Sequence, residues 1–258
     1  MIRVRKRFGQ HFLHDQGVLQ RIVDAVNPMT GQHVVEIGPG SGALTARLLE
    51  QIASMDAVEI DRDLAATLSA RWPSQLRLHS GDALQFDFAA LSLQCGGPLR
   101  IVGNLPYNIS TPLLFHLLQY RHCIVDLHIM LQKEVIDRMA AAEGDDDYGR
   151  LTVMLAPWVT IEKLFDVGPG AFQPPPRVWS AVARLTVLQQ PRFPVPEHYS
   201  VVVAQAFSQR RKTLRNSLRS LISEDSWQIV GVDPGARPET LAPQQFAALA
   251  ALAQPGQL

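Results

Sequence analysis

Between His33 and Asp166, short apolar runs rich in β-forming residues alternate with stretches whose apolar residues recur at helical spacing. This alternation is typical of a parallel sheet covered by helices on both faces, because parallel strands need long crossover connections. We therefore expect an α/β fold with a doubly wound, mostly parallel sheet. The expected strands are His33–Ile37, Asp56–Ile60, Leu76–His79, Leu99–Val102, Val125–Leu131 and Thr160–Val167.

The second half of the chain changes character after a strand-like run over Val178–Leu188. Pro191, Pro194 and Pro196 follow it, and prolines so clustered interrupt regular structure. Beyond them apolar residues recur at helical spacing, ending in an Ala-rich stretch from Pro243 to Ala253. We expect one large domain over residues 1–190, which includes a basic N-terminal arm, and a small helical domain over residues 191–258.

The composition fits an ordinary globular protein: 258 residues, 47% hydrophobic and 19% charged. A chain of this size buries enough surface to need neither disulfides nor a structural metal. Cys95 and Cys123 form no Cys-x-x-Cys motif, and no apolar run approaches the roughly 20 residues of a membrane span. We expect a cytoplasmic monomer without bound metal and without a membrane segment.

The formal net charge is zero, yet the charges are separated along the chain. Residues 1–21 hold five basic side chains against one acidic, and residues 177–219 hold eight against one. Arg outnumbers Lys 20 to 4, and its planar group suits phosphate, with a GC-rich codon bias as the alternative explanation. The asymmetry favours a nucleic-acid partner.

A glycine-rich turn, Gly38-Pro39-Gly40-Ser41-Gly42, follows the first expected strand and opens the first helix. Glycines in such a turn let the backbone approach a nucleotide closely, although the spacing differs from G-x-G-x-x-G and a purely structural turn is the alternative. Glu59 ends the second strand about 20 residues later, where a carboxylate can accept from both ribose hydroxyls. Asp82 ends the third strand and can accept from an adenine amino group. Together they predict a nucleotide crevice.

Gly103-Asn104-Leu105-Pro106-Tyr107-Asn108 follows the fourth strand at the same edge of the sheet. An exocyclic base amine is a poor nucleophile because its lone pair is delocalised into the ring. The Asn104 side-chain oxygen and the backbone carbonyl of Leu105 or Pro106 can hold both N–H groups and turn the lone pair outward. Tyr107 adds a stacking face for the base. The structural alternative is a proline turn with a buried tyrosine.

A basic segment, Gln209–Arg219, spaces Arg211, Arg215 and Arg219 four residues apart, which predicts one helical face. Like charges so placed repel, and bound phosphate would compensate, whereas a solvated face is the alternative. Leu214, Leu218 and Leu221 would form the opposite, buried face.

These residues resemble the KsgA/RsmA family of small-subunit rRNA adenine dimethyltransferases, over about Arg7 to Leu221. The motifs that carry the resemblance are Gly9–Leu13 (GQHFL), Glu36–Gly42 (EIGPGSG), Val58–Arg62 (VEIDR), Gly103–Ser110 (GNLPYNIS), Met130–Glu134 (MLQKE), Phe172–Val178 (FQPPPRV) and Gln209–Ser217 (QRRKTLRNS).

The resemblance implies a Rossmann-like class I methyltransferase domain with S-adenosyl-L-methionine as cofactor. The family's cofactor-contacting positions fall on His11, Leu13, Gly38, Glu59, Asp82 and Asn104. Its amine-methylation motif falls on Asn104, Leu105, Pro106 and Tyr107, and Phe172 matches the aromatic that faces the flipped base opposite Tyr107. The implied rRNA contacts are Arg210, Arg211, Lys212, Arg215 and Arg219.

The implied reaction is dimethylation of the N6 amines of two adjacent adenosines near the 3′ end of 16S rRNA within the 30S subunit, with a role in late subunit assembly. An Erm-like methylation of large-subunit rRNA is the nearest alternative. A nicotinamide dehydrogenase would explain the glycine turn but not the residues from Asn104 to Tyr107. A non-enzymatic assembly factor would explain the basic segments but not the intact site residues.

Overall fold

The structure is a computed structural model that describes residues 11–209 and 211–254. The chain forms two compact units, one of residues up to 136 with residues 161–187, and one of residues 137–160 with residues from 188 onward. The boundary between residues 187 and 188 lies close to the expected boundary at residue 190. The assignment of residues 137–160 to the first domain was wrong, because they belong to the second unit. Tyr148 and Val153 belong to the apolar core of the helical unit, where they pack with Tyr199.

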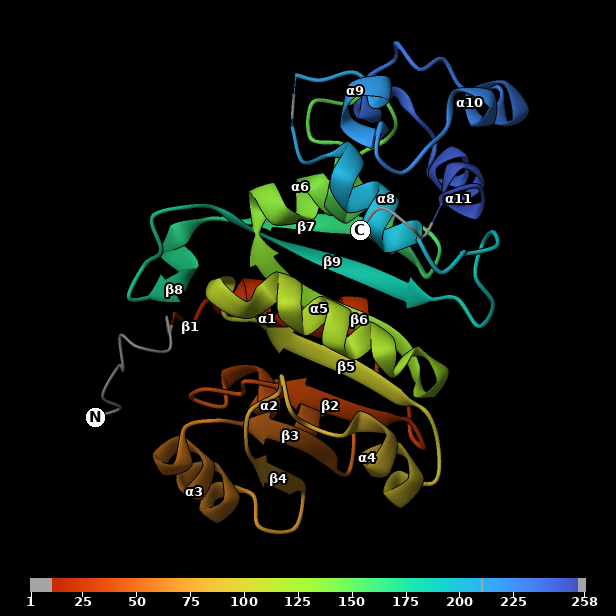
Figure 1. Cartoon of the computed structure of the whole chain (residues 1–258). Coiled ribbons are helices and arrows are strands. Elements are labelled where there is room, and N and C mark those ends of the chain that lie inside the picture. Colours follow the sequence, from red (N-terminus) through yellow and green to blue (C-terminus); the bar gives the residue numbers. More distant parts are fainter. Residues whose placement is uncertain (1–10, 210, 255–258) are drawn as a thin grey trace. The chain divides into compact units, whose positions relative to one another are not determined.

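A seven-stranded sheet in the order β4-β3-β2-β5-β6-β9-β7 forms the centre of the first unit (Figure 1). The pairings β4–β3, β3–β2, β2–β5 and β5–β6 are parallel, and β6–β9 is antiparallel. The α/β fold with a mostly parallel sheet is therefore confirmed. The strands are β2 His33–Ile37, β3 Met55–Glu59, β4 Leu76–Ser80, β5 Leu99–Asn104, β6 Ile124–Gln132, β7 Val159–Val167 and β9 Ser180–Val187.

Helices flank the strands of the sheet, and three of these helices begin at an aspartate cap. Asp15, Asp61 and Asp87 each accept a backbone N–H from the first turn of the following helix, which satisfies a donor that the helix itself cannot. The helices of this region are α1 Gln16–Val26, α2 Ala43–Leu49, α3 Arg62–Arg71, α4 Phe88–Cys95, α5 Ser110–Gln119 and α6 Lys133–Ala140.

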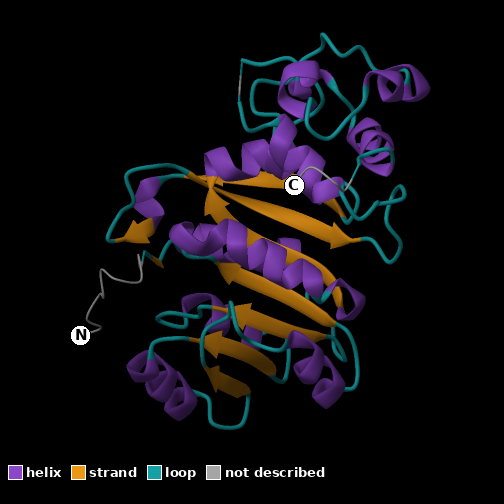
Figure 2. Cartoon of the chain, viewed as in Figure 1, coloured by secondary structure: helices purple, strands orange, loops and turns teal. Residues whose placement is uncertain are grey.

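The helices bury apolar side chains against the sheet. In Figure 2, α5 crosses in front of the central strands, and its Leu113, Leu114 and Leu117 are almost fully buried. α1 and α2 contribute Leu19 and Leu48 to another cluster, which also contains residues of the central strands. Strands covered in this way read as continuous apolar runs, which is why the sequence identified them.

A two-stranded ribbon joins the beginning of the described chain to the segment before β9. β1 Phe12–Leu13 pairs antiparallel with β8 Phe172–Gln173, with Leu13 opposite Phe172. This pairing holds the N-terminal arm against residues that lie some 160 positions later in the sequence.

The helical unit contains α7 Arg150–Leu155, α8 Tyr199–Ala206, α9 Leu214–Leu218, α10 Glu224–Val230 and α11 Pro243–Ala251. Leu214, Leu218 and Leu221 are buried, as predicted. The predicted arginine face was wrong, because α9 has only five residues and excludes Arg211 and Arg219. The first N–H groups of α9 are bound from outside, Leu214 by the carbonyl of Ala236 and Arg215 by that of Pro234.

Candidate active site

A cavity opens at the carboxyl ends of β2, β3, β4 and β5, the edge at which open α/β sheets bind ligands. The loops that follow these strands form most of its wall, and residues 11–13 of the N-terminal arm form a further part. Nine of the residues predicted from the sequence line it: His11, Leu13, Gly38, Glu59, Asp82, Asn104, Leu105, Pro106 and Tyr107.

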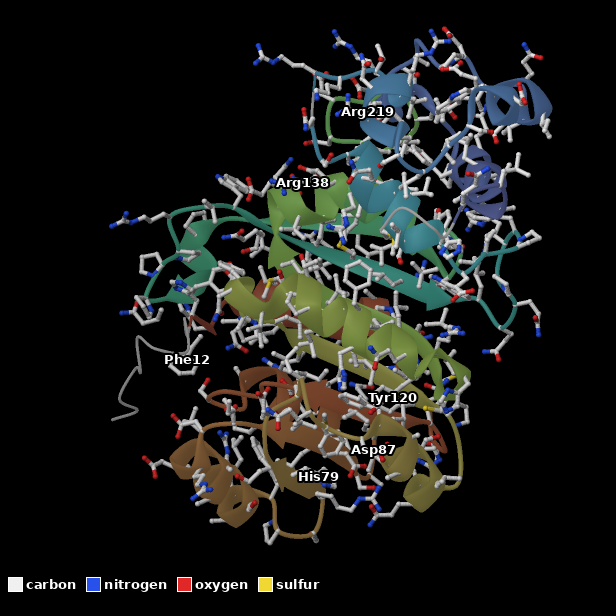
Figure 3. The ribbon with its side chains drawn as sticks, viewed as in Figure 1. Phe12, His79, Asp87, Tyr120, Arg138 and Arg219 are labelled. Atoms are coloured by element: carbon white, nitrogen blue, oxygen red, sulfur yellow. The ribbon has the colours of Figure 1, made fainter. Side chains whose placement is uncertain are left out.

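Gly38, Gly40 and Gly103 all line the cavity, but glycine is required at each of them for a different structural reason. Gly38 adopts φ +67°, and a Cβ there would meet no atom within 4 Å, so its backbone faces open space. At Gly40 a Cβ would come within 3.0 Å of the ring of Phe12, a residue of the N-terminal arm that is labelled in Figure 3. At Gly103 it would come within 2.6 Å of the Ile37 carbonyl oxygen. Only Gly38 fits the expected close approach to a ligand; the others permit close packing.

Glu59 is held at the end of β3 by two backbone donors. Its Oε1 accepts from the N–H of Asp61 at 2.9 Å, and its Oε2 accepts from the N–H of Gly40 at 3.1 Å. Burial raises the pKa of Glu59, and these hydrogen bonds oppose the shift. The neighbouring Asp61 caps α3 instead, so Glu59 is the carboxylate that lines the cavity.

Asp82 follows β4 and lines the cavity beyond Glu59. Its Oδ1 accepts from the N–H of Leu84 at 2.9 Å, which fixes the carboxylate in the turn. The two carboxylates thus stand on the loops after neighbouring parallel strands, β3 and β4.

The Asn104 amide has a defined orientation. Its Nδ2 donates to the backbone carbonyl of His11 at 3.0 Å, so the amide nitrogen is bound and Oδ1 is left as an acceptor. The Pro106 carbonyl already accepts from Ile109 at 3.2 Å. The Leu105 carbonyl accepts no hydrogen bond from any described residue, and Leu105 lines the cavity.

Tyr107 is fixed from two sides. Its hydroxyl lies 2.7 Å from Oγ of Ser180, and its ring stacks on the His11 imidazole with centroids 5.8 Å apart. The His11 Nδ1 in turn donates to the carbonyl of Pro174 at 2.8 Å. Burial raises the pKa of Tyr107, so the phenol is neutral at physiological pH.

Phe172 does not lie with the other predicted residues. Its side chain is 2% exposed, it belongs to the apolar core, and it does not line the cavity. Its pairing with Leu13 places it behind the arm. In this structure Phe172 supports the cavity wall, and its ring does not face the space where a base would enter.

Two buried titratable residues of the cavity escaped the sequence analysis. Glu36 accepts from the Thr45 hydroxyl at 2.5 Å, and burial raises its pKa to about 7. His128 on β6 is 2% exposed, and neither of its ring nitrogens has a hydrogen-bond partner among the described residues. Burial lowers the pKa of His128. Glu36 opens the glycine motif and was available as a signal; an apolar run surrounds His128 and gives none.

Comparison with known proteins identifies the family. The model of the ribosomal RNA adenine dimethylase family matches residues 1–254. The chain belongs to this family. Proteins called ribosomal RNA small subunit methyltransferase A are 52% identical in both Hahella chejuensis and Pseudomonas aeruginosa. The alignments cover 95% and 96% of this chain, and 91% and 94% of those proteins.

Solved structures agree with this ribosomal RNA adenine dimethylase fold. A dimethyladenosine transferase from Plasmodium falciparum has a TM-score of 0.78 at 23% identity, covering 94% of this chain and 99% of its own. The 23S rRNA methyltransferase ErmE has a TM-score of 0.72 at 26% identity, covering 93% and 98%. A Rossmann-like class I methyltransferase fold is thereby confirmed. Among the described residues, no helix is long and apolar enough to span a bilayer.

Proposed function

We propose that this enzyme transfers methyl groups from S-adenosyl-L-methionine to the N6 amines of two adjacent adenosines in the loop of the 3′-terminal hairpin, helix 45, of 16S rRNA. The substrate would then be the 30S subunit at a late stage of its assembly, and the enzyme would act in the cytoplasm. The observation that carries the proposal is the pair of unused acceptors, Asn104 Oδ1 and the Leu105 carbonyl, beside the Tyr107 ring. The relatives called small subunit methyltransferase A favour this substrate over large-subunit rRNA.

The cavity residues fit the proposed cofactor. Both oxygens of Glu59 are aligned by backbone donors and keep lone pairs for the two ribose hydroxyls. Asp82 has one oxygen free of the Leu84 bond for the adenine amino group. Gly38 leaves open space for the remainder of the molecule. His11 and Leu13 would cover the cofactor from the arm. Bound S-adenosylmethionine supplies an electrophilic methyl group on a positively charged sulfur.

The protein's part in the reaction is to orient the amine. Asn104 Oδ1 and the Leu105 carbonyl accept from the two N–H groups of N6, so the lone pair leaves conjugation with the ring and points at the methyl carbon. Tyr107 holds the base by stacking. Catalysis by position and orientation of this kind needs no strong base. In each transfer the bond from N6 to the methyl carbon would form as the methyl–sulfur bond breaks, and N6 would lose one proton to solvent. After the first transfer one N–H therefore remains, so one acceptor suffices for the second.

The test of the amine site compares Asn104→Ala with Asn108→Ala, because Asn108 is exposed and does not line the cavity. Loss of one preorganised polar group at a reacting centre lowers kcat by about 100-fold or more. We expect that loss for Asn104→Ala and less than a twofold change for Asn108→Ala. Activity of Asn104→Ala within a few-fold of the wild type would contradict the role of the side chain.

The substrate is tested by transfer of labelled methyl groups to under-methylated small subunits and to large-subunit RNA, followed by nucleoside analysis. N6,N6-dimethyladenosine confined to small-subunit RNA is expected. Label only in large-subunit RNA would establish the Erm-like alternative, and no label in either would refute the proposed activity.

We assign the basic segment to phosphate contacts. Arg211, Lys212, Arg215 and Arg219 are exposed, and Arg210 lies outside the described residues. Arg215 also lies 3.2 Å from Glu224, an exposed pair of small energetic value that phosphate can replace. Replacing Arg211 or Lys212 by Ala should reduce the slope of log affinity against log salt by about one. Arg237→Ala, an exposed arginine of the same unit outside the segment, is the control; an equal change there would refute the assignment.

A further inference from the structure

Trp179 is an exposed tryptophan that the proposed reaction does not use. Its side chain is 56% exposed, whereas the other three tryptophans of the chain are buried or partly buried. An indole left in water forgoes a large amount of apolar burial, so an exposed one indicates a binding surface more often than an exposed aliphatic residue does. Val178, beside it, is also exposed.

The indole is held in place on one side. A Cβ added to Gly168 would lie 3.6 to 3.9 Å from three atoms of the six-membered ring, so the ring packs over that glycine at ordinary contact distance. The Trp179 carbonyl accepts from the N–H of Lys133 at 2.9 Å, which fixes the backbone. The aromatic surface is therefore presented to solvent from a fixed position.

Trp179 immediately precedes a residue that contacts the wall of the cavity. The following residue, Ser180, is buried at the start of β9, and its Oγ lies 2.7 Å from the Tyr107 hydroxyl. All of these residues belong to the same compact unit. Arg177, two residues earlier, is exposed and makes no ion pair with a described residue. An aromatic plane with a nearby unpaired arginine is the combination that binds single-stranded nucleic acid.

We propose that Trp179 stacks on an unpaired nucleobase of the RNA that flanks the adenosine held at Tyr107, with Arg177 on the adjoining phosphate. The inference rests on the proposed function and adds a second base-binding position outside the cavity. Two adjacent target adenosines cannot occupy one amine site together. A platform beside the site would hold the neighbour while its partner reacts, and would thereby raise the affinity for the loop.

The experiment compares Trp179→Ala, Trp179→Phe and the control Leu93→Ala, an exposed apolar residue of the same unit. Because stacking on an aromatic contributes strongly to single-strand binding, Trp179→Ala should raise the KM for under-methylated small subunits by about 5- to 100-fold. The kcat at saturating subunits and the Kd for S-adenosylmethionine should stay within twofold. Trp179→Phe should recover most of the affinity, and Leu93→Ala should resemble the wild type.

A spectroscopic measurement separates stacking from a structural effect. Binding of a short single-stranded RNA with the loop sequence should quench the indole fluorescence of the wild type, and Trp179→Phe should lose most of that quenching. An unchanged KM for Trp179→Ala, or an altered Kd for S-adenosylmethionine, would overturn the inference. So would a raised KM without quenching, which indicates a ribosomal protein contact. If the wild type itself fails to methylate small subunits, the proposed function fails instead.

Discussion

The hydrogen bond between the Tyr107 hydroxyl and Ser180 Oγ allows an asymmetric prediction about stability. Ser180 is 0% exposed, whereas Tyr107 lines the cavity and is partly exposed. Tyr107→Phe leaves a buried serine hydroxyl without this partner, and Ser180→Ala leaves a phenol that can turn to water in the cavity. Only the first change strands a polar group away from solvent.

The expected magnitudes follow from that difference. An unsatisfied buried hydroxyl costs about 1–3 kcal/mol of unfolding free energy, while loss of a hydrogen bond whose partner is rehydrated costs about 0.5–1.5 kcal/mol. The double variant removes both polar groups, so it should be no less stable than Tyr107→Phe alone. The coupling energy in the double-mutant cycle should therefore be about 1 kcal/mol.

Urea unfolding of the four proteins at neutral pH measures these quantities. Burial raises the pKa of Tyr107, so the phenol stays neutral there and no titration complicates the comparison. Additive effects, or a Ser180→Ala variant less stable than Tyr107→Phe, would refute the reasoning. Methylation assays of the same position test its role in the reaction. Tyr107→Phe keeps the stacking ring and should retain methyltransferase activity within about tenfold of the wild type. Tyr107→Ala should abolish methyl transfer while leaving RNA binding nearly intact.

Three further predictions concern the cavity. Glu59→Gln places an amide NH₂ against the N–H of Asp61 or Gly40 and should weaken cofactor binding about 10- to 100-fold, as calorimetry would measure; an unchanged Kd would contradict the role of Glu59. Gly103→Ala should lower the unfolding free energy by about 1–3 kcal/mol, because its Cβ would lie 2.6 Å from a backbone carbonyl; a thermal melt at the wild-type temperature would argue against it. The pKa of Glu36 is raised from 4.5 to about 7, so the native state binds the proton more tightly, and stability should fall by up to about 3 kcal/mol as pH rises from 4.5 through 7. Glu36→Gln should remove that slope, and a variant with an unchanged pH profile would exclude Glu36 as its source.

The sequence predicted the cavity well because its residues lie where parallel strands end. The central strands are rich in apolar residues, and the residue after each strand must stand at the carboxyl edge of the sheet. Glu59 was expected at this edge, and it lines the cavity: both of its oxygens are held by backbone donors, whereas the neighbouring Asp61 caps α3. Local patterns thus determined both the edge and the side chains on it.

The errors arose where contacts between distant segments decide the structure. Arg211 and Arg215 have helical spacing, but the N–H of Leu214 bonds to the Ala236 carbonyl, and Thr213 is extended, so the helix begins after Arg211. Residues 137–160 lie between two strands of the sheet in the sequence, and we therefore assigned them to the first domain. Val153 is nevertheless buried in the core of the helical unit. No periodicity within a segment reveals a partner from 20 or 100 residues away.

The orientation of Asn104 shows how such a distant contact can still control the chemistry. Its amide nitrogen is bound by the main-chain carbonyl of His11, so the acceptor that faces a base depends on where the arm lies and not on the imidazole. The imidazole has separate partners, the Pro174 carbonyl and the Tyr107 ring. The arm is itself fixed by pairing with β8. Consequently Asn104 and Tyr107 are both oriented only when the β1–β8 ribbon is in place, and the residues that would cover the cofactor also complete the site for the amine.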